Sequence, residues 1–233
     1  SQIGLKRLRV FDFVLFLCAS CYRIFILQQS PVLFLLFLDL FAGEETLILT
    51  DPVMGDDGEV YPIYTEGLRS RFRELVSRSY VITPNLTEAL LLLYGKEEME
   101  KKWKVLETMP EAERLEKIQE IGQRLVLEFS LSAVVITGVN YRENSQTPKM
   151  GNLVLEKEKV SWVFAEKSGG SYSGTGDLFA SVLSAGLVKG YSMETCAHMA
   201  VEFISTSIRD AVSEGTDRND GVCFEAHLGM LLS

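Results

Sequence analysis

The chain has 233 residues and a formal net charge of −9, with 32 acidic and 23 basic residues. This length is enough for one α/β domain with a substantial core, and it excludes a miniprotein held together by disulfide bonds. The negative charge, without a long Lys/Arg cluster, argues against nucleic acid and anionic membranes as partners.

The N-terminal segment 10–41 is strongly apolar. A membrane span needs about 20 predominantly apolar residues in one run, and Asp12, Arg23 and Asp39 interrupt this one. No small-x-small cleavage site follows the early basic residues, so a secretory signal peptide is not expected. We therefore expect buried strands and helices here, in a cytoplasmic protein.

The four cysteines are Cys18, Cys21, Cys196 and Cys223. A single Cys-x-x-Cys pair without a second pair of ligands is poor evidence for zinc, and its apolar surroundings offer no cation that would stabilise a thiolate. The interpretation is therefore free thiols in a reducing compartment. The two histidines of the chain are too few for a histidine-based metal site or a catalytic triad.

From residue 46 onward, short apolar runs alternate with helical stretches, which predicts an α/β fold with a mostly parallel sheet and helices on both faces. The expected strands are 46–50, 80–83 and 133–137, followed by a hairpin of 152–156 and 159–164. The absence of an internal repeat or a low-complexity linker favours one domain.

The same pass along the chain predicts helices from apolar residues at helical spacing. They cover 64–77, 85–94, a stretch beginning near Pro110, 175–189 and 192–212. Asn85 and Ser192 are suited to cap their helices, because their side-chain oxygens can accept an unpaired amide of the first turn. The charged segment 96–104 is expected to be a solvated surface excursion.

A glycine-rich turn, Gly174-Thr175-Gly176-Asp177, leads directly into an amphipathic helix. Glycines let backbone amides approach an anion closely, and the unpaired amides and dipole of a helix start favour negative charge there. Asp177 in the first turn would repel a phosphate but can accept the proton of an alcohol that attacks one. The alternative is an ordinary glycine loop in which Asp177 only begins the helix.

Two acidic residues follow predicted strands. Asp51 opens the segment DPVMGDDGEVY at the carboxyl end of its strand, where open α/β sheets bind ligands. The later Asp56, Asp57 and Glu59 are expected to be solvated, because their spacing does not match a calcium loop. Glu88 lies three residues after Asn85 and either completes a capping box or holds Mg²⁺ through water.

In this order, DPVMGDDGEVY, TPNLTEA, VVITG and GTGDLFAS closely resemble the C-terminal portion of the pyridoxal/pyridoxine (B6-vitamer) kinases of the ribokinase-like superfamily. GTGD alone is typical of the superfamily, whereas a DPVMGD segment followed by TPN-xx-E and GTGD favours B6 kinases over sugar kinases. The resemblance implies a ribokinase-like domain over 1–233, with 46–233 handling nucleotide and phosphate and 1–45 poorly matched. It also implies that the N-terminal region of this chain is shorter than that of typical family members.

The implied reaction is ATP-dependent phosphorylation of the 5′-hydroxymethyl group of pyridoxal, pyridoxine or pyridoxamine. Asp177 matches the catalytic base, which also contacts the substrate. The anion hole corresponds to Gly174, Thr175 and Gly176. The ATP-binding positions correspond to Asp51, Asn85, Glu88, Thr137 and Gly138.

The resemblance further implies that Asp51 and Glu88 organise Mg²⁺ through water and that Tyr61 lies near the substrate. A homodimer and a requirement for a monovalent cation such as K⁺ are expected as well. The alternatives are a hydroxymethylpyrimidine (phosphate) kinase, whose turn resembles GTGC rather than GTGD, and an ATP-binding relative without catalysis.

Overall fold

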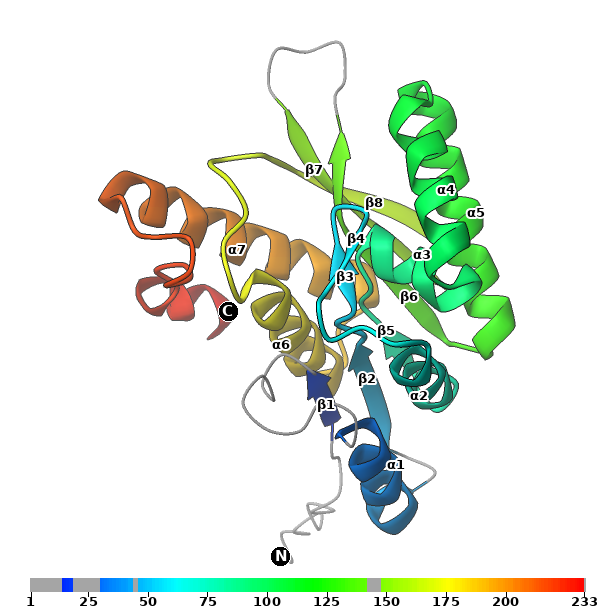
Figure 1. The fold of residues 1–233 in the computed structure, drawn as a ribbon. Helices are drawn as coiled ribbons and strands as arrows, with labels where there is room; N and C mark the ends of the chain where they lie inside the picture. The colour runs from blue at the N-terminus through cyan, green and yellow to red at the C-terminus, as the bar shows by residue number, and fades with distance from the viewer. Residues whose placement is uncertain (1–13, 19–29, 44–45, 142–147, 233) are drawn as a thin grey trace, which may run out of the picture.

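The central feature of the computed structural model, which describes residues 14–18, 30–43, 46–141 and 148–232, is a six-stranded sheet in the order β1-β2-β5-β6-β7-β8 (Figure 1). The strands of this sheet are β1 (Val14–Cys18), β2 (Leu47–Asp51), β5 (Val81–Ile82), β6 (Ala133–Tyr141), β7 (Lys149–Glu156) and β8 (Lys159–Glu166). The first four run parallel to one another, and β7 and β8 continue antiparallel. The predicted α/β class and mostly parallel sheet are therefore confirmed.

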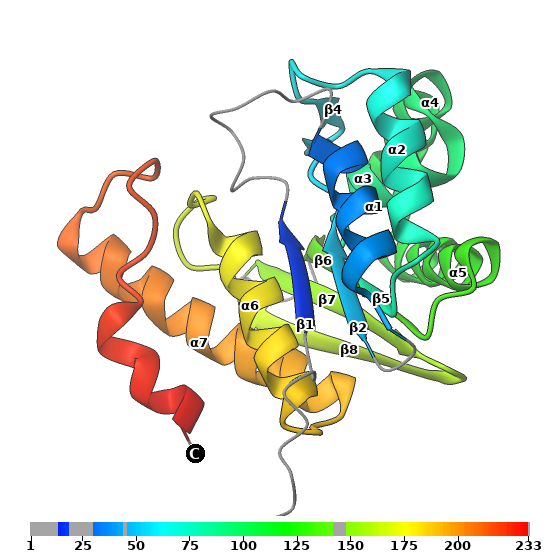
Figure 2. The same cartoon turned by 90° about the horizontal axis from the view of Figure 1, so that it is seen from below.

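Helices cover both faces of the sheet, and Figure 2 shows α6 and α7 on one side and α1 to α5 on the other. The first layer consists of α1 (Ser30–Phe41), α2 (Glu66–Val76), α3 (Leu86–Tyr94), α4 (Lys96–Thr108) and α5 (Glu111–Phe129). The second consists of α6 (Thr175–Val188) and α7 (Met193–Glu214), and the 3₁₀ segment η2 (Glu225–Leu232) packs near α7.

The strands are apolar on both sides because successive side chains point to opposite faces of the sheet. In β2, Ile48 packs into the layer of α1 to α5, whereas Leu49 packs into the layer of α6 and α7. Val134 and Val135 of β6 divide in the same way. The carboxyl ends of the parallel strands consequently meet at one edge between two packed layers.

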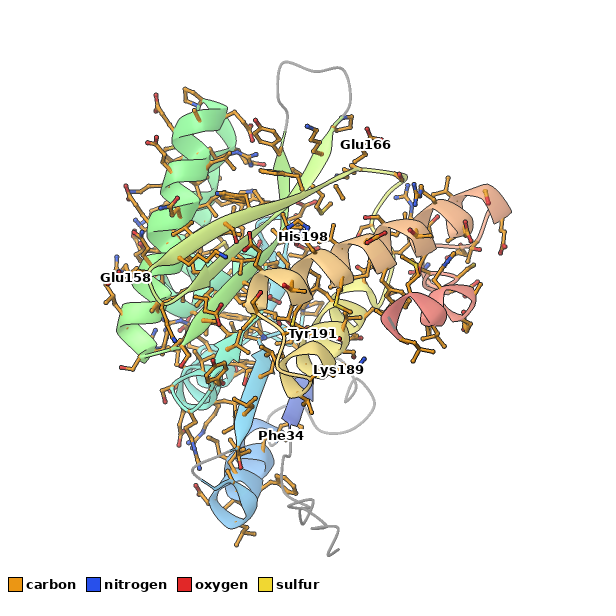
Figure 3. All side chains as sticks on the ribbon, turned by 180° about the vertical axis from the view of Figure 1, so that it is seen from behind. Phe34, Glu158, Glu166, Lys189, Tyr191 and His198 are labelled. Atoms are coloured by element: carbon orange, nitrogen blue, oxygen red, sulfur yellow. The ribbon has the colours of Figure 1, made fainter. Side chains whose placement is uncertain are left out.

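The helix starts agree with the sequence-based expectations. Thr65 accepts a hydrogen bond from the amide of Leu68 and caps α2, so this helix begins slightly later than the predicted 64. Asn85 caps α3, and Ser192 caps α7. Figure 3 labels Lys189 and Tyr191 in the turn between α6 and α7, and it also labels the exposed His198 of α7.

Residues 96–104, predicted to be a solvated surface excursion, are mostly exposed, but they also form most of the helix α4, which was not among the predicted helices. The segment is rich in charge, yet Met99 and Leu106 are buried, which gives the helix an apolar face. The charge density hid this helix from the sequence analysis, because apolar residues seven positions apart form a weak signal within a charged run.

The N-terminal segment supplies a strand and a helix where it is described. β1 pairs in parallel with β2, and Leu35 and Leu38 of α1 are buried in the core. Cys196 and Cys223 are free thiols, as expected, whereas Cys21 lies outside the described residues. Among the helices that the structure describes, none combines the length and apolar character that crossing a bilayer requires.

Candidate functional site

The carboxyl end of β2 carries Asp51, which is 7% exposed. The hydroxyl of Thr83, at the end of the neighbouring strand β5, donates a 2.9 Å hydrogen bond to Oδ1 of Asp51. Thr83 is itself 3% exposed. The pairing of β2 with β5 therefore fixes one oxygen of this carboxylate and leaves Oδ2 directed elsewhere.

Glu88 in the first turn of α3 forms the capping box that the sequence suggested. Its Oε2 accepts the amide of Asn85 at 2.9 Å, and its own amide donates to Oδ1 of Asn85 at 3.0 Å. Its Oε1 accepts the amide of Met54, three residues beyond Asp51, at 3.1 Å. Glu88 thus connects the start of α3 to the segment that follows β2.

That segment forms a short hairpin, β3 (Gly55–Asp56) and β4 (Glu59–Val60), which α3 holds in place. The side-chain amide of Asn85 donates to the carbonyl of Gly55 at 2.8 Å, and the hydroxyl of Thr87 accepts the amide of Gly58 at 2.9 Å. Tyr61 follows the hairpin, and its amide donates to the carbonyl of Met54. Glu59 and the two aspartates of the hairpin are exposed, as predicted.

The glycine turn begins α6 at the same edge of the sheet. Gly174 has φ +81°, offers no capping side chain, and faces open space where a Cβ would stand. A Cβ on Gly176 would lie 3.8 Å from Oδ2 of Asp51. The hydroxyl of Thr175 donates to the carbonyl of Tyr172, so its backbone amide rather than its side chain is placed to meet an anion.

The carboxylates at this edge act on one another electrostatically. Burial raises the pKa of Asp51 from 3.8 to about 7, the hydrogen bond from Thr83 opposes this shift, and the charge of Asp177 adds to it. Burial and then the charge of Asp51 hold the pKa of Glu88 well above its usual range. None of the ion pairs between described residues involves either group. The edge is therefore a cluster of acidic groups, and a bound cation would stabilise their ionised forms.

Thr137 and Gly138, which the resemblance assigned to ATP binding, also lie in this region. Thr137 forms a parallel bridge with Asn85, and its amide donates to the carbonyl of Pro84. Gly138 has φ +70° and lies at a register shift between Ile136 and Val139. The structure thus brings the predicted site residues to one edge of the sheet. Asp51 lies at the end of β2 beside the glycine turn that begins α6, and Thr137 of β6 lies beside Asn85 at the start of α3.

Sequence reasoning missed three groups that organise this edge: the hydroxyls of Thr83 and Thr87 and the amide of Met54. All of them lie inside the motifs DPVMGD and TPN-xx-E, so membership of a motif was the one feature of the sequence that could have indicated their role. Only the paired strands show that the Thr83 hydroxyl is directed to Asp51 rather than to solvent. His198 and His227 lie outside this edge: His198 is exposed, and Nε2 of His227 is 2.8 Å from Oδ2 of Asp210.

Two curated proteins are similar to this chain. A pyridoxine kinase of Bacillus subtilis is 29% identical over 168 residues, which cover 70% of this chain and 54% of the relative. A pyridoxine/pyridoxal/pyridoxamine kinase of Bordetella avium is 27% identical over 161 residues, which cover 69% of this chain and 48% of the relative. The chain spans about half the length of the curated relatives it matches.

A solved structure from Bacteroides thetaiotaomicron, described as a phosphomethylpyrimidine kinase and crystallised with pyridoxal, superposes with a TM-score of 0.73 at 25% identity. The match covers 88% of this chain and 68% of that one. The family model described as phosphomethylpyrimidine kinase matches residues 35–221, which extends the similarity beyond the predicted start at 46. The chain therefore belongs to the phosphomethylpyrimidine kinase family, the ribokinase-like group that also contains the pyridoxal kinases.

Proposed function

We propose that this protein transfers the γ-phosphate of ATP to the 5′-hydroxymethyl group of a B6 vitamer: pyridoxal, pyridoxine or pyridoxamine. The observation that carries the proposal is the juxtaposition of the glycine turn of α6 with Asp51, next to an aspartate in the first helical turn. This arrangement offers amides for a transferred phosphate and a carboxylate for the attacking alcohol.

In the proposed mechanism, Asp177 accepts the proton of the hydroxymethyl group as its oxygen attacks the γ-phosphorus. The bond from that phosphorus to the β,γ-bridging oxygen breaks, and ADP leaves. The amides of Gly174, Thr175 and Gly176 stabilise the charge on the transferred phosphoryl group, because they are oriented before the reaction begins. Most of the acceleration then comes from positioning and electrostatics rather than from covalent chemistry.

The residues at the strand ends fit a divalent cation. Asp51 is a buried carboxylate whose pKa is raised, which is the situation that a bound cation relieves. Mg²⁺ keeps most of its waters and needs only one or two carboxylates, so Asp51 and, through water, Glu88 would hold it. When bound, Mg²⁺ neutralises charge on the β and γ oxygens of ATP.

The second candidate is phosphorylation of hydroxymethylpyrimidine or its phosphate. It is favoured by the description of the matching family and of the solved relative. Both reactions use a primary alcohol, so the described edge serves either one. The combination of DPVMGD and GTGD favours the B6 vitamer. The last residue of this turn is Asp177, whereas the turn of the pyrimidine kinases resembles GTGC and ends in cysteine.

An assay of ATP consumption tests the proposal. The intact chain is incubated with Mg·ATP and, separately, with pyridoxal, pyridoxine, pyridoxamine and hydroxymethylpyrimidine, and the phosphorylated product is identified by mass. Product with a B6 vitamer supports the proposed substrate, and product with hydroxymethylpyrimidine alone supports the second candidate. Binding of ATP without turnover of any of the four would indicate a non-catalytic relative.

The assigned base is tested by Asp177→Asn. We expect kcat to fall by about 10²- to 10⁴-fold, because the amide cannot accept the proton. The KM for ATP should change little, since a negative charge does not assist phosphate binding. Glu202→Gln, a change of an exposed acid on α7, is the control. Unchanged turnover in Asp177→Asn contradicts the assignment.

The roles of Asn85, Thr137 and Gly138 at the nucleotide and of Tyr61 at the substrate stay predictions. The same holds for the homodimer, the monovalent cation and the cytoplasmic location.

A further inference from the structure

Helix α4 contacts the hairpin next to the candidate site. Trp103, a half-buried residue of α4, packs against the core between the sheet and α1 to α5. Its indole also lies directly over Gly58 at the turn of the hairpin: a Cβ there would be 2.5 Å from Nε1 and 2.6 Å from Cδ1. Figures 1 and 2 both show the hairpin beside α3, with α4 next to that helix.

The turn under the indole has a strict backbone requirement. Asp57 has φ +50° and Gly58 has φ +80°, which is the pattern of a two-residue hairpin turn with both central residues left-handed. Glycine adopts this conformation without strain and also leaves room for the indole. The backbone of Gly58 is therefore held from two sides, by Trp103 from α4 and by the hydroxyl of Thr87 from α3.

The hairpin cannot hold its position by itself. Each of its strands has two residues, and even longer isolated hairpins are only marginally stable in water. It nevertheless connects Asp51 to Tyr61 and supplies the Gly55 carbonyl to Asn85 and the Met54 amide to Glu88. The geometry of the site thus depends on contacts that fix the hairpin from outside.

We propose that Trp103 is a positioning residue, which acts through Gly58 to hold the β3–β4 hairpin in place at the Asp51 edge. The proposal rests on the proposed function only for its kinetic consequence. If the hairpin is in place for only a fraction of the time, the apparent dissociation constant rises by the inverse of that fraction. The chemical step is unaffected once substrate is bound, because the bound state contains the ordered hairpin.

The test compares Trp103→Ala and Trp103→Leu with Val105→Ala. Leucine keeps apolar packing on the core but removes the indole from Gly58, so it remains informative if the alanine variant does not fold. Val105 lies on the same helix and is 56% exposed, which makes it the matched control. Hydrogen exchange of the ligand-free proteins is measured by mass spectrometry, together with kcat and KM for Mg·ATP and pyridoxal.

We expect faster exchange in the peptide covering 55–61 for both Trp103 variants, with the peptide covering α7 unchanged. KM for at least one substrate should rise about fivefold while kcat stays within about twofold. Unchanged protection of 55–61 overturns the proposal, and so does faster exchange there with both KM values unchanged in an active enzyme. If the unmodified protein shows no turnover, the proposed function fails, and the exchange of 55–61 alone decides the role of Trp103.

Discussion

At the scale of single residues, the site is organised by hydrogen bonds to carboxylates that have no cationic partner among the described residues. Thr83 donates to Asp51, and the amides of Met54 and Asn85 donate to Glu88. These bonds stabilise the charged forms, whereas burial stabilises the neutral forms. Because burial is the larger effect at both residues, their protons are held more tightly than in water.

This balance predicts a pH dependence of stability. Between pH 3.8 and about 7, folded Asp51 keeps a proton that the unfolded chain releases. The free energy of unfolding of the metal-free protein should therefore decrease as the pH rises through this window. Asp51→Asn should make the decrease smaller, because the amide does not titrate.

The measurement is urea unfolding from pH 5 to pH 8 in the presence of a chelator. Asp57→Asn, which changes an exposed acid of the hairpin, is the control. An Asp51→Asn variant whose pH dependence equals that of the parent would contradict the raised pKa of Asp51.

At the scale of elements, helix starts contribute both to the fold and to the site. Asn85 and Ser192 are both N-caps whose side chains accept a backbone amide. Asn85 additionally donates to the carbonyl of Gly55 and so fixes the hairpin. Ser192 has no such contact with the site and serves as a matched cap.

Asn85→Ala and Ser192→Ala should each lower the free energy of unfolding by about 1 kcal/mol, the usual cost of losing a cap. Only Asn85→Ala should also raise KM for Mg·ATP, because it releases the Gly55 carbonyl. Denaturant unfolding and steady-state kinetics on both variants separate the two effects. Equal KM values in the two variants would show that Asn85 acts as a cap alone.

At the scale of the whole molecule, the two helical layers share one sheet. Leu92 is fully buried in the layer of α1 to α5, and Phe203 is 1% exposed in the layer of α6 and α7. Neighbouring residues of the same strand pack into opposite layers. Unfolding of one layer therefore exposes one face of the sheet and destabilises the strands on which the other layer packs.

We therefore expect a single unfolding transition for the entire chain. Leu92→Ala should cost about 2–5 kcal/mol and Phe203→Ala about 3–5 kcal/mol, each with an unchanged denaturant slope. Tryptophan fluorescence and far-ultraviolet circular dichroism should report the same midpoint in each variant. Separate midpoints would contradict the single domain expected from the sequence.

Much of this architecture could be read from local pattern. The apolar runs around Ile48 and Val134 indicated buried strands, and Asn85 and Ser192 marked helix starts, because strand burial and capping depend on neighbouring residues. The motifs also indicated which residues lie at strand ends. Helix α4 escaped this approach, since its two buried side chains are embedded in a charged run.

The sequence by itself determined the fold class, the family resemblance and the identity of the acidic and glycine residues at the site. Only the tertiary structure decided that Thr83 donates to Asp51, that Gly176 faces Oδ2 of Asp51, and that Trp103 covers Gly58. These contacts join segments that are 32 to 125 residues apart, as the numbers of Thr83, Asp51 and Gly176 show. The physical reason is that strand pairing and helix packing fix such distances, whereas local propensity acts only between neighbours in the chain.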